Sequence, residues 1–152
     1  MREVRKAKVT EAQAIIDLHD DTIRKINSRD YSQAQVEMWI GTRSIEITQS
    51  MIESDEYCVC VDHTGKLLGW GHLKENEIFG LYVFADHQSQ GIGSAILEYM
   101  EKEAREAGIE ELHSQSTITA LGFYRKQGYE ELDHVRLGKA RLYALTIRKR
   151  IE

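Results

Sequence analysis

The stretch that decides the fold is EIFGLYVFADHQSQGIGSAILEYM, residues 77–100. It starts with the apolar run of a strand, continues through a short polar loop and ends in an amphipathic helix. Gly91 and Gly93 allow the backbone to approach a ligand closely, at a helix N-terminus whose N–H groups lack intrahelical partners. This geometry favours a bound phosphate or diphosphate. Glycines before a helix can also serve only as turn residues, so the loop alone leaves both interpretations open.

Two other phosphate-binding loops do not fit this stretch. A Walker loop requires Gly-Lys-Ser/Thr after four spacer residues, and the chain contains no such string. A dinucleotide fingerprint requires a small residue where Ile96 stands, and it follows an early parallel strand rather than a series of hairpins.

The order of patterns on both sides predicts an α/β fold with a mixed, mostly antiparallel sheet flanked by helices, in a single domain over residues 1–152. Upstream we expect a strand in 2–9, a helix opened by a Thr10–Gln13 capping box, a helix between a Ser32–Gln35 capping box and Gly41, and a helix near 44–53. Strands follow at 56–61, 66–73 and 77–84, then a helix over 91–107, a strand at 111–116, a helix over 117–127 and strands at 129–137 and 140–149.

The helix over 91–107 has one apolar and one charged face. The periodicity puts Ile92, Ala95, Ile96, Tyr99, Met100, Ala104 and Ala107 on the buried side. It puts Glu98, Glu101, Lys102 and Arg105 on the solvent side.

Bulk composition restricts the partners. With 152 residues and 41% hydrophobic composition, the chain suits one core. The net charge is -5 and the basic residues are scattered among carboxylates, so no nucleic-acid surface is expected. There is no apolar run of the roughly 18–20 residues that a membrane span needs, and the first residues lack the apolar centre of a secretory signal. We therefore expect a soluble cytoplasmic protein without a membrane partner.

Cys58 and Cys60 are two residues apart on a predicted strand, so both thiols point from one face and do not suit an intrastrand disulfide. We expect reduced, packed thiols. His63 is nearby, but a structural zinc needs four ligands and no second pair is found, so no metal is expected.

Residues 88–93, QSQGIG, match the Q/R-x-x-G-x-G/A motif of the GNAT superfamily of N-acetyltransferases, and the preceding LYV resembles the strand that those proteins show. A second segment, TALGFYRKQGYEEL at 119–132, resembles the family's A-x-x-F-Y-x-x-x-G-F/Y pattern. Two motifs in the expected order are more specific than one. The resemblance covers most of the chain, and 25–55 is the family-variable region.

The resemblance implies a GNAT fold and acetyl transfer from acetyl-CoA, as cosubstrate, to a primary amine of a small molecule or peptide. Cofactor-binding roles would fall on Gln88, Ser89, Gln90, Gly91, Ile92, Gly93 and Ser94 at the diphosphate, and on Leu81, Tyr82, Val83, Thr117, Phe123 and Tyr124. The backbone of 81–83 would pair with the pantetheine arm and acetyl carbonyl, where this strand splays from 111–116. Tyr124 stands where the family places its general acid, and Glu77 where some members place a general base.

The general base has more than one candidate. On an ideal strand Glu77 shares a face with Phe79 and Leu81, so its carboxylate would reach a substrate cleft. His72 on the preceding strand is a rival, because an unperturbed imidazole pKa near 6.5 suits proton removal at neutral pH. A chain of water molecules is a third route.

Three positions depart from the family pattern: Ser89 replaces a frequent glycine, Ala85 a common proline and Thr117 a frequent asparagine. The departures at Thr117 and Ser89 motivate an alternative, a non-catalytic acyl-CoA-binding or sensing module. A metal-dependent or nucleotide-binding protein is a third hypothesis. The resemblance identifies neither the acceptor amine nor the acyl chain length, and it leaves a homodimer open.

Overall fold

The computed structural model describes residues 1–152 and contains one seven-stranded sheet in the order β1-β2-β3-β4-β5-β7-β6. Every neighbouring pair is antiparallel except β4 and β5. The strands are β1 (Arg2–Lys6), β2 (Glu56–Asp62), β3 (Leu67–Lys74), β4 (Glu77–Val83), β5 (Glu111–Thr117), β6 (Glu130–Leu137) and β7 (Leu142–Arg150). The predicted mixed, mostly antiparallel sheet is confirmed.

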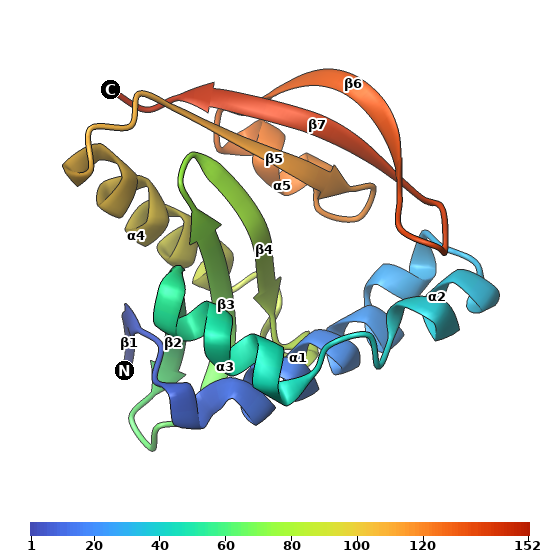
Figure 1. Ribbon diagram of the computed structural model, residues 1–152, viewed down its shortest axis with the longest axis horizontal. Helices are drawn as coiled ribbons and strands as arrows, with labels where there is room; N and C mark the ends of the chain where they lie inside the picture. The colour runs from blue at the N-terminus through green and yellow to red at the C-terminus, as the bar shows by residue number, and fades with distance from the viewer.

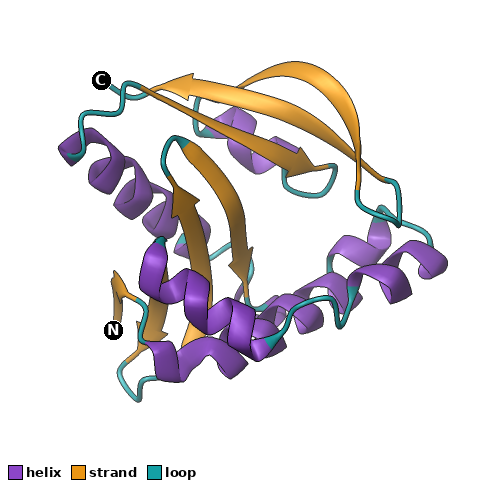
Figure 2. Cartoon of the chain, in the orientation of Figure 1, coloured by secondary structure: helices purple, strands orange, loops and turns teal.

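Five α-helices flank the sheet on both sides (Figure 2). They are α1 (Ala12–Lys25), α2 (Gln33–Trp39), α3 (Ile45–Ser54), α4 (Ile92–Glu106) and α5 (Leu121–Lys126). Short 3-10 turns at Val9–Glu11, Asn27–Arg29 and Ala85–His87 connect them. No helix combines the length and apolar composition that a bilayer crossing demands.

Strand β2 shows how the sheet divides two cores. Tyr57 and Val59 pack with α1 and α3 on one face, whereas Cys58 and Cys60 pack with α4 on the other. This follows from the alternation of side chains along a strand. Figure 1 shows the positions of these helices around β2. Both cysteines are buried and free, as predicted, and burial raises the pKa of Cys58 to about 12, so its thiol stays protonated.

Of the three helix starts predicted before residue 55, two are confirmed. Ser32 and Gln35 form a reciprocal capping box, and the Ser44 hydroxyl accepts a hydrogen bond from the Ile47 N–H at 3.2 Å. The Thr10–Gln13 capping box is wrong. The chain makes a 3-10 turn there, in which Glu11 accepts from the Lys8 N–H at 2.8 Å. Glu11 takes this role because the guanidinium of Arg5 from β1 holds its carboxylate, an interaction that local spacing does not reveal.

Two residues of the predicted helix over 91–107 have a different burial from the one that the periodicity predicts. Ala107, expected inside, is exposed at the helix end. Glu101, expected in solvent, is buried, where it accepts from the Tyr129 hydroxyl at 2.9 Å and from Lys149 Nζ at 3.1 Å. These partners satisfy a charge that would otherwise be costly to bury.

Strands β4 and β5 diverge after a short parallel contact. Only Glu77 pairs with His113 and Ile78 with Ser114. The pairing of β3 with β4 shifts between His72 and Leu73, at an irregularity that re-aims the strand. The sheet is therefore open from Phe79 onward, on the side where β5, β7 and β6 curve away (Figure 1).

Candidate active site

The divergence of β4 and β5 opens a cleft of about 510 Å³. Nearly all residues that the sequence assigned to cofactor binding line it: Leu81, Tyr82, Val83, Gln88, Ser89, Gly91, Ile92, Gly93, Ser94, Thr117, Phe123 and Tyr124. Gln90 does not line the cleft, and its carbonyl instead accepts from Arg2 Nη1 at 2.7 Å. Segments far apart in the sequence thus meet in one place.

The loop before α4 offers its backbone to this cleft. None of the N–H groups from Ser89 to Ser94 donates an intramolecular hydrogen bond, and the first helical bond runs from the Ala95 N–H to the Gly91 carbonyl at 3.1 Å. Ser89 and Gly91 both have left-handed backbone, with φ of 61° and 79°. Successive free N–H groups at a turn and a helix N-terminus form a concave site for an anion.

The edge of β4 that faces the cleft is set by its pairing with β3. The Phe84 N–H donates to the Leu68 carbonyl at 2.8 Å, and Tyr82 is aligned with Trp70. Because backbone groups alternate in an antiparallel ladder, Tyr82 also directs its N–H and C=O toward β3. Leu81 and Val83 therefore direct theirs into the cleft, and the backbone role expected of Tyr82 falls to them.

One of these groups is already used. The Val83 carbonyl accepts from the Thr22 hydroxyl at 2.9 Å and from Gln88 Nε2 at 2.7 Å. The Val83 N–H and both backbone groups of Leu81 are the ones left for a ligand. The Thr117 hydroxyl accepts from the Ala120 N–H at 3.1 Å and so shapes the turn before α5.

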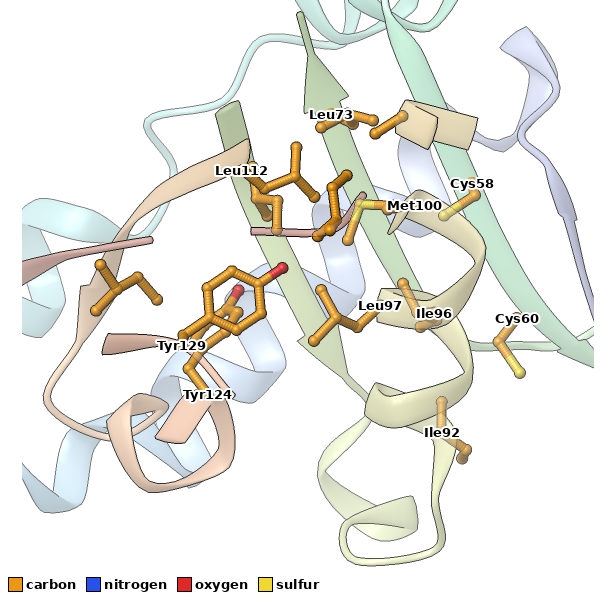
Figure 3. Packing of buried hydrophobic residues seen from close by; sticks show 14 of the residues in the cluster. Cys58, Cys60, Leu73, Ile92, Ile96, Leu97, Met100, Leu112, Tyr124 and Tyr129 are labelled. Carbon is orange, nitrogen blue, oxygen red and sulfur yellow. The ribbon is translucent and has the colours of Figure 1, made fainter. Parts of the chain in front are cut away.

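Tyr124 lies on α5 with its ring in the core and its side chain 4% exposed. Its ring packs edge-on against Tyr129 with centroids 5.3 Å apart (Figure 3). Burial raises the pKa of Tyr124 well above its usual value, although a hydrogen bond with the Ser114 hydroxyl acts in the opposite direction. The phenol is therefore protonated at neutral pH.

A second cleft of about 670 Å³ lies across the splay from the first. Phe79, Tyr82, Gln115 and Thr117 line both clefts, so the two spaces meet where β4 leaves β5. The second cleft is bounded by α1, α2, α3 and the turn between β6 and β7. A two-sided arrangement of this kind suits a reaction between two different ligands.

Both candidate bases line the second cleft and not the first. His72 Nε2 is 2.8 Å from Asp55 Oδ2, and the imidazole stacks on Tyr57 at 4.2 Å. Burial lowers the pKa of His72 below its usual value despite the favourable charge of Asp55, so the ring is neutral at pH 7. Glu77 is half-buried and its carboxylate makes no hydrogen bond or ion pair with the protein. Asp55 could not be found from local sequence patterns, because it is 17 residues away from His72.

No group of three or more His, Cys, Asp or Glu side chains is arranged to hold a metal ion.

The fold and the site together have the organisation of an acyltransferase. The model of the GNAT acetyltransferase domain matches residues 27–141, and the chain belongs to this family. The fold is shared with a GCN5-related N-acetyltransferase from Rhodopseudomonas palustris, with 21% identity, a TM-score of 0.92 and coverage of 99% of this chain and 96% of that one.

Two further solved structures have the same fold. The PaiA N-acetyltransferase from Thermoplasma acidophilum, in complex with coenzyme A, is 22% identical with a TM-score of 0.83 and covers 99% of each chain. The putative acetyltransferase YncA from Salmonella typhimurium, with acetyl-CoA, is 15% identical with a TM-score of 0.74 over 100% of this chain and 95% of that one.

A curated relative, the uncharacterized protein YxbD of Bacillus subtilis, is 36% identical over 42% of this chain and 51% of its own length. The match therefore spans about half of that relative.

Proposed function

We propose that this protein transfers an acetyl group from acetyl-CoA to a primary amine of a small molecule or peptide. One observation carries the proposal: a loop of free N–H groups, the open edge of β4 and a buried tyrosine converge in one cleft. Family membership supports acetyl transfer. The separate cleft on the other side of the splay supports a second substrate.

The residues present fit coenzyme A. In this proposal the N–H groups of Ser89 and of Gly91 to Ser94 hold the diphosphate, and Lys126 at the cleft lining adds positive charge. Leu81 and the Val83 N–H pair with the amide-bearing arm. A Cβ at position 93 would lie 3.2 Å from the Phe123 ring. The absence of a side chain at Gly93 therefore leaves space for a ligand between the loop and this ring. The presence of CoA or acetyl-CoA in two structural neighbours supports the assignment.

Bound acetyl-CoA supplies an activated thioester. Amide formation then needs a proton acceptor for the attacking amine and a proton for the departing sulfur. We assign the second task to Tyr124 Oη, which holds its proton at neutral pH. Desolvation in the same cleft also raises the pKa of the departing thiol, so the sulfur takes up a proton more readily there than it would in water.

We propose that the Glu77 carboxylate accepts the proton of the attacking amine. Glu77 lines the second cleft, and its carboxylate has no hydrogen-bond or ion-pair partner in the protein. His72 is the competing candidate, since Asp55 fixes one of its nitrogens and the ring is neutral. A Glu77→Gln and a His72→Gln variant separate them, because only loss of the true base removes the acidic limb of the rate against pH.

The function is tested by thiol release from acetyl-CoA in the presence of a panel of primary amines. Amine-dependent release, with an N-acetylated product in the mass spectrum, is the expected result. Tight acetyl-CoA binding without release across the panel would contradict transfer and favour a binding module.

A further inference from the structure

The second cleft, which holds the acceptor amine in the proposed function and is therefore the acceptor cleft, contains an arginine without an acidic partner. Arg43 is half-buried at the start of α3 and lines this cleft. Its guanidinium lies over the Trp70 ring at 5.0 Å and donates to the Tyr57 hydroxyl at 3.4 Å, but no carboxylate is within ion-pair distance. Arg5, also half-buried, is held by both oxygens of Glu11 at 2.8 and 2.9 Å. Arg43 is thus left with most of its donors free.

The charge of Arg43 affects two other residues that line the cleft, His19 and Tyr82. Burial, followed by the charge of Arg43, lowers the pKa of His19 to about 4. Burial raises the pKa of Tyr82 to about 12, and the charge of Arg43 opposes that rise. The Trp70 ring under Arg43 has its centroid 5.0 Å from that of Tyr82, which belongs to both clefts. Arg43 therefore lies near the point where the two substrates would meet.

The charges that line the acceptor cleft are unlike those of the whole chain. The chain carries a net charge of -5, yet this lining holds Arg43 and Lys139 against the single carboxylate of Glu77. His19 is neutral at pH 7, and Asp55 behind the cleft is engaged with His72. The cleft therefore offers both a cation that can bind an anion and a carboxylate that can bind an ammonium group.

Part of the lining of the same cleft is both apolar and exposed. Met38, Ile47 and Phe79 are exposed by 50%, 57% and 51%, although most large hydrophobic side chains of the protein are buried. Three exposed apolar side chains around one opening mark a surface that a ligand with an apolar body would cover.

We infer that the acceptor is a free amino acid with an apolar side chain, whose carboxylate binds Arg43 and whose amino group faces Glu77. The inference rests on the proposed acetyl transfer and specifies its substrate class. Guanidinium and carboxylate form paired, charge-assisted hydrogen bonds. A polyamine would place a second ammonium group near Arg43, and a peptide amino terminus carries an amide where the carboxylate is needed.

The test compares L-leucine, L-methionine and L-phenylalanine with their C-terminal amides, with phenethylamine and spermidine as further acceptors. We expect kcat/KM for each free acid to exceed that of its amide at least about tenfold. The ammonium group of the amide is more acidic, so a larger fraction of the amide is neutral amine at pH 7. If the amount of neutral amine alone set the rates, the amides would react faster than the free acids.

Arg43→Gln is expected to lower kcat/KM for the free acids to about the level of their amides, with little change for the amides. Arg136→Gln is the matched control, because Arg136 also lies over an aromatic ring, Tyr143, at 5.1 Å, but is exposed and outside the cleft. Calorimetric titration of each variant with acetyl-CoA, together with its circular dichroism, shows whether it is folded. The comparison of acids and amides in the unaltered protein needs no variant.

Equal rates for acids and amides, a preference for spermidine or phenethylamine, or equal losses for acids and amides in Arg43→Gln would overturn the inference. So would the absence of both turnover and calorimetric binding of the free acids. Acetyl-CoA binding with turnover of other amines would leave the proposed transfer intact. Failure to bind acetyl-CoA, or to acetylate any amine, would instead refute the proposed function itself.

Discussion

At the scale of single residues, the environment of a side chain decides its chemical role more than its type does. Tyr124 and Tyr129 are adjacent in the core and both are nearly inaccessible. Only Tyr124 lines the cleft, whereas the Tyr129 hydroxyl is bound to Glu101 at 2.9 Å. Two similar phenols therefore lie in different surroundings, and only Tyr124 is placed for the role in the reaction that we propose for it.

Replacing Tyr124 with Phe removes the proposed proton donor while keeping the ring. We expect kcat to fall by about 10²- to 10⁴-fold with little change in KM for acetyl-CoA, the range typical of a lost general acid. Steady-state thiol release measures both constants. Tyr129→Phe is the control and should lower stability by about 1–3 kcal/mol, since Glu101 loses a buried donor, but leave kcat near normal. Full turnover in Tyr124→Phe would show that another group protonates the sulfur.

Ser89 is a second residue whose backbone matters more than its side chain. Its φ of 61° costs a non-glycine residue about 1–2 kcal/mol. Ser89→Gly removes that strain and adds about 0.5–1 kcal/mol of unfolded-state entropy. We expect a net stabilisation of up to about 1 kcal/mol in urea unfolding, with CoA affinity retained. A loss of stability would mean that the serine side chain makes a contribution that outweighs the strain.

At the scale of elements, the contact between β3 and α4 positions the loop that carries the free N–H groups. Gly69 on β3 allows this contact, because a Cβ there would lie 2.8 Å from Ile96 Cδ1 and 2.9 Å from the Tyr82 carbonyl oxygen. The carbonyl belongs to the neighbouring strand and cannot move without disturbing the ladder between β3 and β4. Strand pairing and helix placement are thus coupled at one glycine.

Gly69→Ala should therefore destabilise the protein by about 1–3 kcal/mol, the cost of overpacking a well-packed core, and weaken CoA binding as α4 shifts. Gly122→Ala is the matched control, because a Cβ at this helical glycine would contact nothing within 4 Å. It should be neutral or stabilise by up to about 1 kcal/mol. Thermal unfolding and CoA titration of both variants measure the difference. Equal stability and equal CoA affinity of Gly69→Ala and Gly122→Ala would contradict the role of Gly69 in the packing of β3 against α4.

The elements themselves were largely predictable from sequence, because they depend on local periodicity and capping. Ser32 with Gln35, and the glycine after α4, are local signals that the structure confirms. Glu101 was misplaced because its partners lie 28 and 48 residues away. Arg5 likewise redirected the start of α1 through Glu11, a contact between elements.

The candidate site was less predictable than the fold. The motif located the loop and Tyr124, but no local pattern indicates that β4 leaves β5 after two residue pairs. The unpartnered state of Arg43 is also invisible in sequence, since it depends on which carboxylates are absent nearby. Such features arise only when distant segments are assembled.

At the scale of the whole molecule, stability at low pH depends on buried histidines that the fold keeps neutral. Burial and then Arg43 lower the pKa of His19 to about 4, and only the neighbouring Asp20 acts in the opposite sense. Burial also lowers the pKa of His72. The unfolded chain protonates these rings near pH 6.5, whereas the folded chain does not until lower pH. The contribution of these neutral histidines to stability is therefore fully present above about pH 7, and it decreases as the pH falls toward 4.

We expect His19 alone to account for a loss of at most about 3 kcal/mol in the free energy of unfolding between pH 7 and pH 4. Urea unfolding across this range measures it. His19→Gln should flatten the dependence, while His63→Gln, at an exposed histidine without a hydrogen bond, should keep it. A His19→Gln profile as steep as the original would show that other groups govern acid stability.

The central claim for the whole molecule is that the N-terminus of α4 binds the diphosphate of acetyl-CoA. Calorimetric titration with acetyl-CoA tests it most directly when Ser94→Asp is compared with the unaltered protein and with Ser94→Ala. A carboxylate in the first turn favours the helix but repels a diphosphate, so it separates folding from binding. Gln127 Nε2 now donates to the Ser94 hydroxyl at 3.0 Å and would find an acceptor in the aspartate too.

We expect one binding site in the unaltered protein and in Ser94→Ala, and at least about tenfold weaker binding in Ser94→Asp with undiminished stability. No heat of binding from the folded, unaltered protein, or equal affinity in Ser94→Asp, would contradict the central claim.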